Sequence, residues 1–266
     1  MAESITESMT KSMTNYKMIF QYDGTRYNGF QRQGNTSNTI CEKIENILNI
    51  LDDRADSDTA PVELHASGRT DAGVHALGQV ANFKLINAAN YSDEYIMNYI
   101  NSYLPADITV LSLTKAADRF HARLNATGKT YAYHIDTRPK ADVFNVRYSL
   151  SHPQPLDVTA MKSAADKLVG THDFRAFTNN SKTKKSTVRT INSITFDSSG
   201  SELVIRYNGD GFLYNMVRIL TGTLILVGEH KISASDVADI LASKNRALAG
   251  PCVAPTGLFL EKVEYN

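Results

Sequence analysis

The chain has 266 residues, 42% hydrophobic and 21% charged, which is typical of a globular protein with one large domain or two ordinary ones. No apolar run approaches the ~20 residues that cross a bilayer, and the Ser-, Thr- and Met-rich start lacks the apolar core of a secretory signal. The 28 basic residues balance the 28 acidic ones, so net charge alone indicates no nucleic-acid partner. We expect a cytoplasmic protein without membrane contact, in which residues 1–15 form a disordered tail.

Hydrophobic periodicity predicts alternating strands and helices. In the first half, in chain order, it predicts a strand at 17–22, a loop at 23–30, a helix at 39–51 capped by Asn38 or Thr39, strands at 62–67 and 78–85, a helix at 92–103 and a strand at 108–114. In the second half it predicts a strand at 131–136, a helix at 157–168, strands at 190–197 and 202–208, helices at 212–227 and 234–242 and a strand at 257–265.

This order of elements favours an α+β fold with two domains, each a sheet with helices on one face. We place the boundary near Lys115, which gives an N-terminal domain at 16–114 and a C-terminal domain at 115–266. No repeat of fixed period is visible, so we do not expect a solenoid.

Metal and disulfide chemistry have little support in the sequence. Cys41 and Cys252 are far apart and form no Cys-x-x-Cys pair, which argues against a disulfide framework and a zinc site. The seven histidines show no metal-ligand spacing such as His-Glu-x-x-His. We therefore expect neither a metal nor a cofactor.

Charged residues are segregated along the chain, which permits a local basic face in a neutral protein. The acidic cluster comprises Asp52, Asp53, Asp56 and Asp58, and the basic cluster comprises Lys182, Lys184, Lys185 and Arg189. A basic cluster of this kind is usually a solvated loop, although it could also contact an RNA backbone.

The run from Ser67 to Gly73, Ser-Gly-Arg-Thr-Asp-Ala-Gly, is the first candidate for chemistry. It places Asp71 in a turn between small residues, where the backbone can approach a ligand closely. An Arg in contact would lower the pKa of this carboxyl group by ~1–3 units, which favours a nucleophile or base over an acid. Taken alone, such a run is more often a solvated turn.

Other stretches strengthen the functional interpretation. Residues 120–123, Phe-His-Ala-Arg, precede the basic and aromatic run Gly-Lys-Thr-Tyr-Ala-Tyr at 128–133. Arg218 lies within a predicted apolar helix, where a charge is costly unless it is paired or reaches solvent from the helix end. Tyr131 alone would more often be a core aromatic, and His75 and His121 are more often structural than catalytic.

Together these stretches resemble the bacterial tRNA pseudouridine synthase A family, which isomerises uridine in the anticodon stem-loop. The similar stretches are Tyr-Asp-Gly-Thr-x-Tyr-x-Gly-Phe-Gln-x-Gln at 22–33, Gly-Arg-Thr-Asp-Ala-Gly-Val-His-Ala at 68–76, Phe-His-Ala-Arg at 120–123, Phe-Leu-Tyr-Asn-Met-Val-Arg at 212–218 and Gly-Leu-x-Leu at 257–260. They follow the family order from about residue 16 to the C-terminus. Each alone would be weak, and the ordered set is specific.

The resemblance implies a role for several residues. Asp71 corresponds to the catalytic aspartate, Arg69 to the arginine that helps extrude the target nucleotide, and Tyr131 to the tyrosine that stacks on the target base. Arg218 corresponds to the arginine that pairs with the aspartate, and Leu258 to an apolar residue of the uracil pocket. Further substrate-binding residues are expected at Arg26, Gln31, Phe120, Arg123 and Lys129.

The resemblance also implies a fold of two ferredoxin-like (RRM-like) halves joined into one mixed, mainly antiparallel sheet, with an RNA-binding cleft between them. The expected partner is tRNA, modified at positions 38, 39 and 40 after the base is flipped out of the stack. A homodimer is expected, and no cofactor.

Two alternatives remain open: a paralogue that modifies another RNA or another tRNA position, and a non-catalytic RNA-binding protein of the same fold. Two others fail on the residues. A haloacid dehalogenase-like phosphatase would need a nucleophilic aspartate where Gln21 stands. A glycoside hydrolase would need a second carboxylate in a convincing loop, and neither Asp23 nor Asp210 has one.

Overall fold

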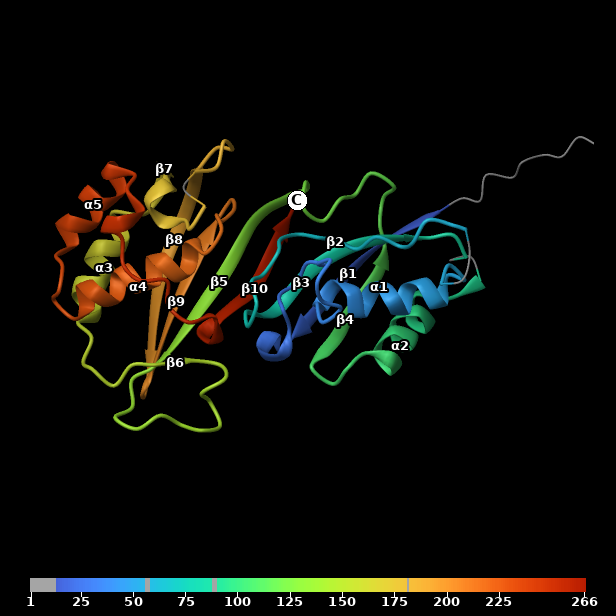
Figure 1. Cartoon of the computed structure of the whole chain (residues 1–266), viewed down its shortest axis with the longest axis horizontal. Coiled ribbons are helices and arrows are strands. Elements are labelled where there is room, and N and C mark those ends of the chain that lie inside the picture. Colours follow the sequence, from blue (N-terminus) through green and yellow to red (C-terminus); the bar gives the residue numbers. More distant parts are fainter. Residues whose placement is uncertain (1–12, 56–57, 88–89, 181) are drawn as a thin grey trace, which may run out of the picture.

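The computed structural model describes residues 13–55, 58–87, 90–180 and 182–266 (Figure 1). Residues 1–12 of the expected tail, and Asp56 of the acidic cluster, lie outside these ranges. Thr14 and Asn15 were also assigned to the tail, and this part of the prediction is wrong. They begin strand β1, where they pair with Leu85 and Lys84 of β3.

Ten strands and five α-helices make up the regular part of the described chain. The strands are β1 (Thr14–Tyr22), β2 (His65–Ala66), β3 (His75–Leu85), β4 (Ile108–Lys115), β5 (Ala126–Asp136), β6 (Leu150–Ser151), β7 (Gly170–Asp173), β8 (Val188–Ser199), β9 (Glu202–Gly209) and β10 (Leu258–Tyr265). The helices are α1 (Ile40–Leu51), α2 (Asp93–Tyr103), α3 (Val158–Asp166), α4 (Met216–Gly228) and α5 (Ala234–Ser243).

All the strands belong to one mixed sheet, in the order β4-β1-β3-β10-β5-β9-β8-β7, with β2 paired to β3 and β6 to β5. Among the described strand pairs, β3–β10 and β5–β6 are parallel and the others are antiparallel. The predicted α+β fold with a mainly antiparallel mixed sheet is therefore confirmed.

The last strand joins the two halves of the sheet (Figure 1). β10 lies between β3 of the N-terminal half and β5 of the C-terminal half, with Leu260 opposite Ala76 on one side and opposite Tyr131 on the other. The sheet is therefore continuous through the middle of the molecule. The domain boundary near Lys115, at the end of β4, stays a prediction.

Strand register shows which side chains share the helix-bearing face. Tyr22 is opposite Ala76, Ala76 opposite Leu260, and Leu260 opposite Tyr131, so all four point to one face, and all are buried. In the N-terminal half, α1 contacts α2, which contacts β4, and in the C-terminal half α4 contacts β5 (Figure 1). The middle of this face, between the two groups of helices, is where the candidate site lies.

Several elements differ from the predicted ones. The helix predicted from 212 begins at Met216, because Asn215 adopts a left-handed conformation with φ 59°. The strand predicted at 62–67 is confined to β2, and β5 begins at Ala126 rather than at 131. β6 and β7, too short to show a hydrophobic period, were not predicted. No helix among the described residues has the length and apolar character needed to cross a membrane.

Candidate active site

The loop that carries Asp71 connects β2 to β3 and forms part of the wall of a cavity of about 730 Å³ on the helix-bearing face. Phe30 donates its backbone N–H to the carbonyl oxygen of Thr70 at 3.0 Å, and the Tyr22 and Thr70 hydroxyl groups lie 2.7 Å apart. Gly29 has φ +94°, and a Cβ there would lie 3.1 Å from the Thr70 oxygen. The segment after β1 thus clamps the Asp71 loop.

A second set of buried polar contacts fixes the start of the same loop. Gln79 of β3 donates to the carbonyl oxygen of Gly68 at 2.9 Å and accepts from the Ser67 hydroxyl at 2.7 Å. Lys129 of β5 donates to the carbonyl oxygen of Ser67 at 2.7 Å. Held at both ends, the loop keeps the Asp71 carboxylate in a fixed position relative to the sheet.

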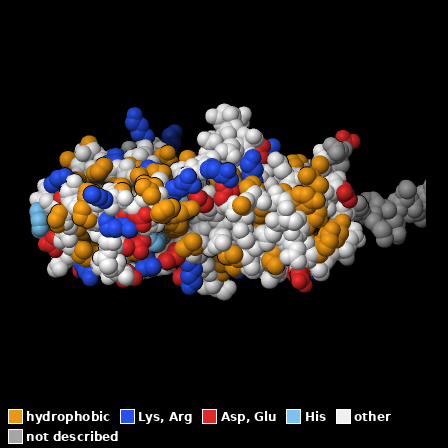
Figure 2. All heavy atoms as spheres, turned by 90° about the horizontal axis from the view of Figure 1, so that it is seen from below, with side chains coloured by type: hydrophobic (Ala, Val, Ile, Leu, Met, Phe, Trp, Pro, Cys, Tyr) orange, Lys and Arg blue, Asp and Glu red, His pale blue; other side chains and the backbone are white. Residues whose placement is uncertain are grey.

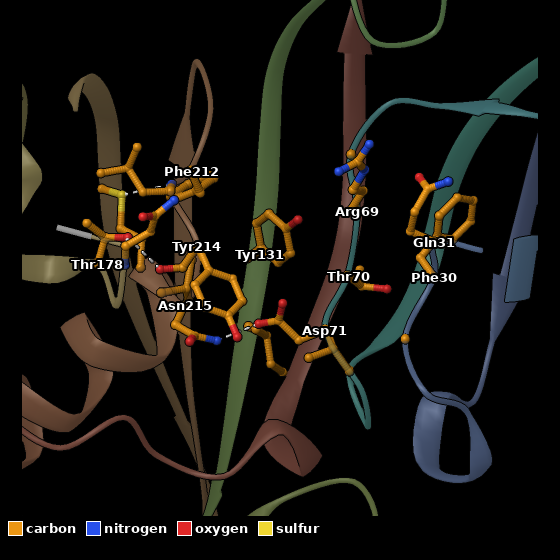
Figure 3. Close-up of a pocket in the computed structure, with 18 of the residues that line it drawn as sticks. Phe30, Gln31, Arg69, Thr70, Asp71, Tyr131, Thr178, Phe212, Tyr214 and Asn215 are labelled. Carbon is orange, nitrogen blue, oxygen red and sulfur yellow. Dashed lines mark hydrogen bonds between the residues drawn. The ribbon is translucent and has the colours of Figure 1, made fainter. Parts of the chain in front are cut away.

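Two side chains approach Asp71, Asn215 from the N-cap of α4 (Figure 3) and Arg218 from the helix itself. The Asn215 amide nitrogen lies 2.6 Å from Asp71 Oδ2, and Arg218 Nη1 lies 3.6 Å from the same oxygen. The Asp71 side chain is 29% exposed, so one part of the carboxylate is enclosed by these donors and another part faces the cavity.

The pKa of Asp71 moves in the direction opposite to the one expected from its Arg partner. Burial raises the pKa of this carboxyl group above its ordinary value, and the lowering by Arg218 and by the Asn215 hydrogen bond does not compensate. The lowering expected from the neighbouring Arg is smaller than the effect of burial. The ionised carboxylate is a stronger base for this shift, so a base or nucleophile remains compatible with the site.

Arg218 has a second partner that accounts for its burial. Its side chain is 16% exposed, and Nε donates to the carbonyl oxygen of Val253 at 2.7 Å. A guanidinium group in this position needs such partners, because an unpaired buried charge is costly. The Val253 carbonyl and the Asp71 carboxylate together hold the arginine in place.

Tyr131 and Leu258 belong to the apolar part of the cavity wall. Both are buried, and the Tyr131 ring meets Phe212 edge to face at 5.2 Å between centroids (Figure 3). Burial raises the pKa of the Tyr131 hydroxyl, which keeps it protonated at neutral pH. A planar ring next to a carboxylate, above an apolar floor, suits a flat heterocycle with polar edges.

Basic side chains surround the mouth of the cavity, where Arg69, Arg123, Lys129, Lys185 and Arg189 all contribute to its lining. Within the described part of the chain, the Arg69 guanidinium has no hydrogen-bond or ion-pair partner. Burial, together with Arg123 and Arg189, lowers the pKa of Lys129 to about 8. On the face seen in Figure 2, acidic and basic side chains are mixed.

Two of the residues predicted to bind substrate lie elsewhere. Arg26 is bound to Asp107, with Nη2 2.6 Å from Oδ2, and Phe120 packs against Tyr265 at 5.4 Å between ring centroids. Neither lines the cavity. Gln31, Arg69, Arg123, Lys129 and Leu258 all line it, as do Asp71 and Tyr131.

Sequence reasoning assigned no role to Asn215, although it lies inside one of the matched stretches. The available signal was an asparagine near the start of the predicted apolar helix, since asparagine tolerates the left-handed conformation better than most residues. The cavity lining also includes Thr178 and Asn180, which no pattern in the sequence distinguished. In the described ranges, no three His, Cys, Asp or Glu side chains are grouped so that they could hold a metal ion.

Comparison with known proteins identifies the family of the chain. The sequence matches the family described as tRNA pseudouridine synthase over residues 18–125 and 164–266. The tRNA pseudouridine synthase A of Bacillus sp. (strain KSM-64) is 47% identical over 253 residues, which cover 95% of this chain and 100% of that protein. The protein of the same name from Streptococcus equi subsp. equi (strain 4047) is 41% identical over 257 residues, covering 96% of this chain and 100% of that one.

Among solved structures, a Cbf5-Nop10-Gar1 complex aligns with a TM-score of 0.35 and 13% identity, covering 79% of this chain and 45% of that chain; this similarity is too low to support an argument. The chain belongs to the tRNA pseudouridine synthase family, whose members named here are isomerases that act on tRNA.

Proposed function

We propose that the cavity isomerises uridines at positions 38, 39 and 40 of the tRNA anticodon stem-loop, with Asp71 as the catalytic carboxylate. The observation that carries this proposal is the position of Asp71, whose carboxylate faces the cavity between Tyr131 and the α4 donors. The volume of about 730 Å³ is within the range of pockets that bind small molecules, and a single nucleotide fits such a space.

The substrate base has to leave the helical stack before it can reach Asp71, which costs a few kcal/mol. Arg69 is exposed at the rim and has no partner among the described residues, so it is free to enter the RNA where the base has left. Tyr131 then supplies a stacking surface and Leu258 an apolar floor. Arg123, Lys129 and Gln31 are placed to contact the flanking backbone.

The reaction breaks the bond between ribose C1′ and uracil N1 and forms a bond between C1′ and C5. The base turns between these steps, the proton on C5 leaves, and N1 of the product carries a proton, so no oxidant or reductant is consumed. Asp71 acts either by adding to the base or the sugar or by abstracting a proton. The protonated Tyr131 hydroxyl stays a donor and does not compete with Asp71 as a base at neutral pH.

The test is to incubate the protein with unmodified tRNA transcripts and to map pseudouridine at single-nucleotide resolution. Product at positions 38, 39 and 40, and its loss when these uridines are replaced by cytidine, is the expected result. Product only at other positions would establish the paralogue alternative. Tight binding without product on any RNA would establish the non-catalytic alternative.

We also propose that the protein works as a homodimer in the cytoplasm, where its proposed substrate is found. Val143 and Phe144, which are 76% and 89% exposed, lie in the loop between β5 and β6, and large apolar side chains at this exposure are typical of a protein contact. The mass of the particle in solution decides this. A mass of about 59 kDa, twice the 29.4 kDa of the chain, is expected, and a monomer at micromolar concentration would contradict it.

A further inference from the structure

Asn215 donates a hydrogen bond to the carboxylate of Asp71. Its amide nitrogen lies 2.6 Å from Asp71 Oδ2, whereas Arg218 Nη1 lies 3.6 Å from that oxygen. Both donors therefore meet the same oxygen. Within the described residues, Asp71 Oδ1 accepts no hydrogen bond.

The backbone at Asn215 is built for this contact. Its φ of 59° and ψ of 9° are left-handed values, which few residues other than glycine adopt readily. Asn215 is the N-cap of α4, yet its side chain makes no capping hydrogen bond to its own helix. Capping is the usual role of an asparagine in this position. Here the amide instead turns away from the helix and toward Asp71 (Figure 3).

A chain of donors fixes which end of the Asn215 amide faces Asp71. Arg246 Nε donates to Asn179 Oδ1 at 3.0 Å, and a guanidinium group can only donate. The other end of the Asn179 amide, Nδ2, is then free to donate to Asn215 Oδ1, at 2.9 Å. This leaves the Asn215 NH₂ group, and not its oxygen, to face the carboxylate.

The chain of donors is itself anchored on both sides. Thr178, next to Asn179, donates its hydroxyl to the carbonyl oxygen of Tyr214, which precedes Asn215. Arg246 Nη1 also donates to the carbonyl oxygens of Ala249 and Gly250. The segment after β7 and the segment after α5 therefore hold the amide in place from behind.

We propose that Asn215 is a positioning residue for Asp71: it engages Oδ2 together with Arg218 and so leaves Oδ1 as the oxygen that acts on the substrate, with Asn179 and Arg246 holding its amide. This inference rests on the proposed catalytic role of Asp71. A carboxylate that can rotate presents either oxygen to the substrate, and a fixed carboxylate presents one of them in a defined direction.

The same hydrogen bond favours the ionised carboxylate. It opposes the burial that raises the pKa of Asp71, so its removal raises that pKa further. Arg218, Tyr131 and Cys252 are titratable groups that interact electrostatically with this carboxylate, and all three remain in a variant at Asn215. Loss of the amide therefore has a signature in the pH profile that a general loss of folding does not have.

The test compares Asn215→Gly, Asn179→Ala and Asp71→Asn in single-turnover assays on a tRNA transcript. Glycine at 215 removes the amide and keeps the left-handed backbone accessible. We expect Asn215→Gly to lower the rate by about ten- to a hundredfold, the range for a hydrogen bond to a charged group. The deficit should be larger at about pH 5.5 than at about pH 8.5, with tRNA affinity within about threefold of wild type. Asn179→Ala should show a smaller deficit with the same pH trend.

His230→Gly is the matched control, because His230 also has a positive φ, of 56°, and lies on the surface at the end of α4. It should leave the rate and the pH profile unchanged. An Asn215→Gly protein with the wild-type rate and pH profile overturns the inference, and an inactive Asp71→Asn in the same experiment shows that the role of Asp71 still stands. If Asp71→Asn keeps its activity, the proposed function itself fails. Should Asn215→Gly not fold, an unchanged pH profile in Asn179→Ala overturns the inference.

Discussion

Arg218, from the third position of α4, places Nη1 3.6 Å from Oδ2 of Asp71, which lies in the loop between β2 and β3. The two residues come from opposite halves of the chain, and the contact crosses the part of the sheet where β10 joins β3 to β5. The proposed catalytic carboxylate and its positive partner therefore meet only when both halves are folded and joined.

Replacement of Arg218 by alanine should reduce both activity and stability. The variant removes the ion pair and the hydrogen bond to Val253 and leaves Asp71 with fewer donors. We expect a loss of about 1.5–3 kcal/mol in the free energy of unfolding, the scale of hydrogen bonds to charged groups. Urea unfolding of wild type and variant measures it. Equal midpoints and equal slopes would show that the contact does not stabilise the fold.

Replacement of Tyr131 separates stacking from core packing. Tyr131→Phe keeps the ring, so kcat/KM should stay close to wild type. Tyr131→Leu keeps most of the apolar volume and removes the ring, so kcat/KM should fall by about ten- to a hundredfold, corresponding to ~1–3 kcal/mol of base stacking. Steady-state kinetics on one tRNA transcript give both values. If Tyr131→Leu works as well as Tyr131→Phe, the ring serves packing alone.

RNA affinity should depend steeply on salt, since contacts between basic side chains and phosphates release counterions. Arg123 is exposed and lines the cavity, so Arg123→Ala should reduce the slope of log K against log salt concentration by about one. Lys140 is also exposed but lies outside the cavity, and Lys140→Ala should keep the wild-type slope. If the affinity of the wild type did not change with salt, the basic side chains that line the cavity would not contact RNA.

The pH dependence of tRNA binding should reveal Lys129. Its pKa is lowered to about 8, so its positive charge is present below about pH 8 and is lost as the pH rises through that value. We expect the affinity for tRNA to weaken over this window, and Lys129→Gln to bind more weakly at neutral pH without this step. Binding isotherms between about pH 7 and pH 9.5 test this. A step of equal size in Lys129→Gln would assign it to another group.

The lowered pKa of Lys129 also predicts that the folded protein becomes more stable as the pH rises, whereas tRNA binding becomes weaker. Between about pH 8 and its ordinary pKa of 10.5, the unfolded state holds more protons on Lys129 than the folded state. The free energy of unfolding should therefore increase as the pH rises through this window. Lys129→Gln lacks that increase, and the difference between the two unfolding curves isolates it from other titrating groups.

Regular elements were predictable because their residues repeat a pattern locally. β1, α1 and β4 have the bounds that alternation and helical period indicate to within a few residues, and Thr39 caps α1 through its hydroxyl, 3.3 Å from the Glu42 nitrogen. β7 has four residues and gains its order by pairing with β8, which no local pattern encodes.

The sequence predicted the site residues that lie in the stretches similar to the family. It predicted less well the properties that depend on three-dimensional surroundings, such as the direction of a side chain or the pKa of a carboxyl group. Asp71, Tyr131 and Leu258 line one cavity as expected, whereas Arg26 turns to Asp107 instead. The raised pKa of Asp71 depends on burial by segments distant in sequence, and spacing alone could not supply it. The Asn215 contact depends on one left-handed residue, which altered where α4 begins.

The most direct test of the central claim is pseudouridine formation at positions 38, 39 and 40 under single-turnover conditions by wild type and Asp71→Asn. Asparagine has nearly the shape of aspartate and lacks its negative charge, and the variant also relieves the burial of a carboxylate with a raised pKa. We expect no product from Asp71→Asn, with tRNA affinity near wild type and no loss of thermal stability. Turnover by Asp71→Asn close to the wild-type rate would contradict the account.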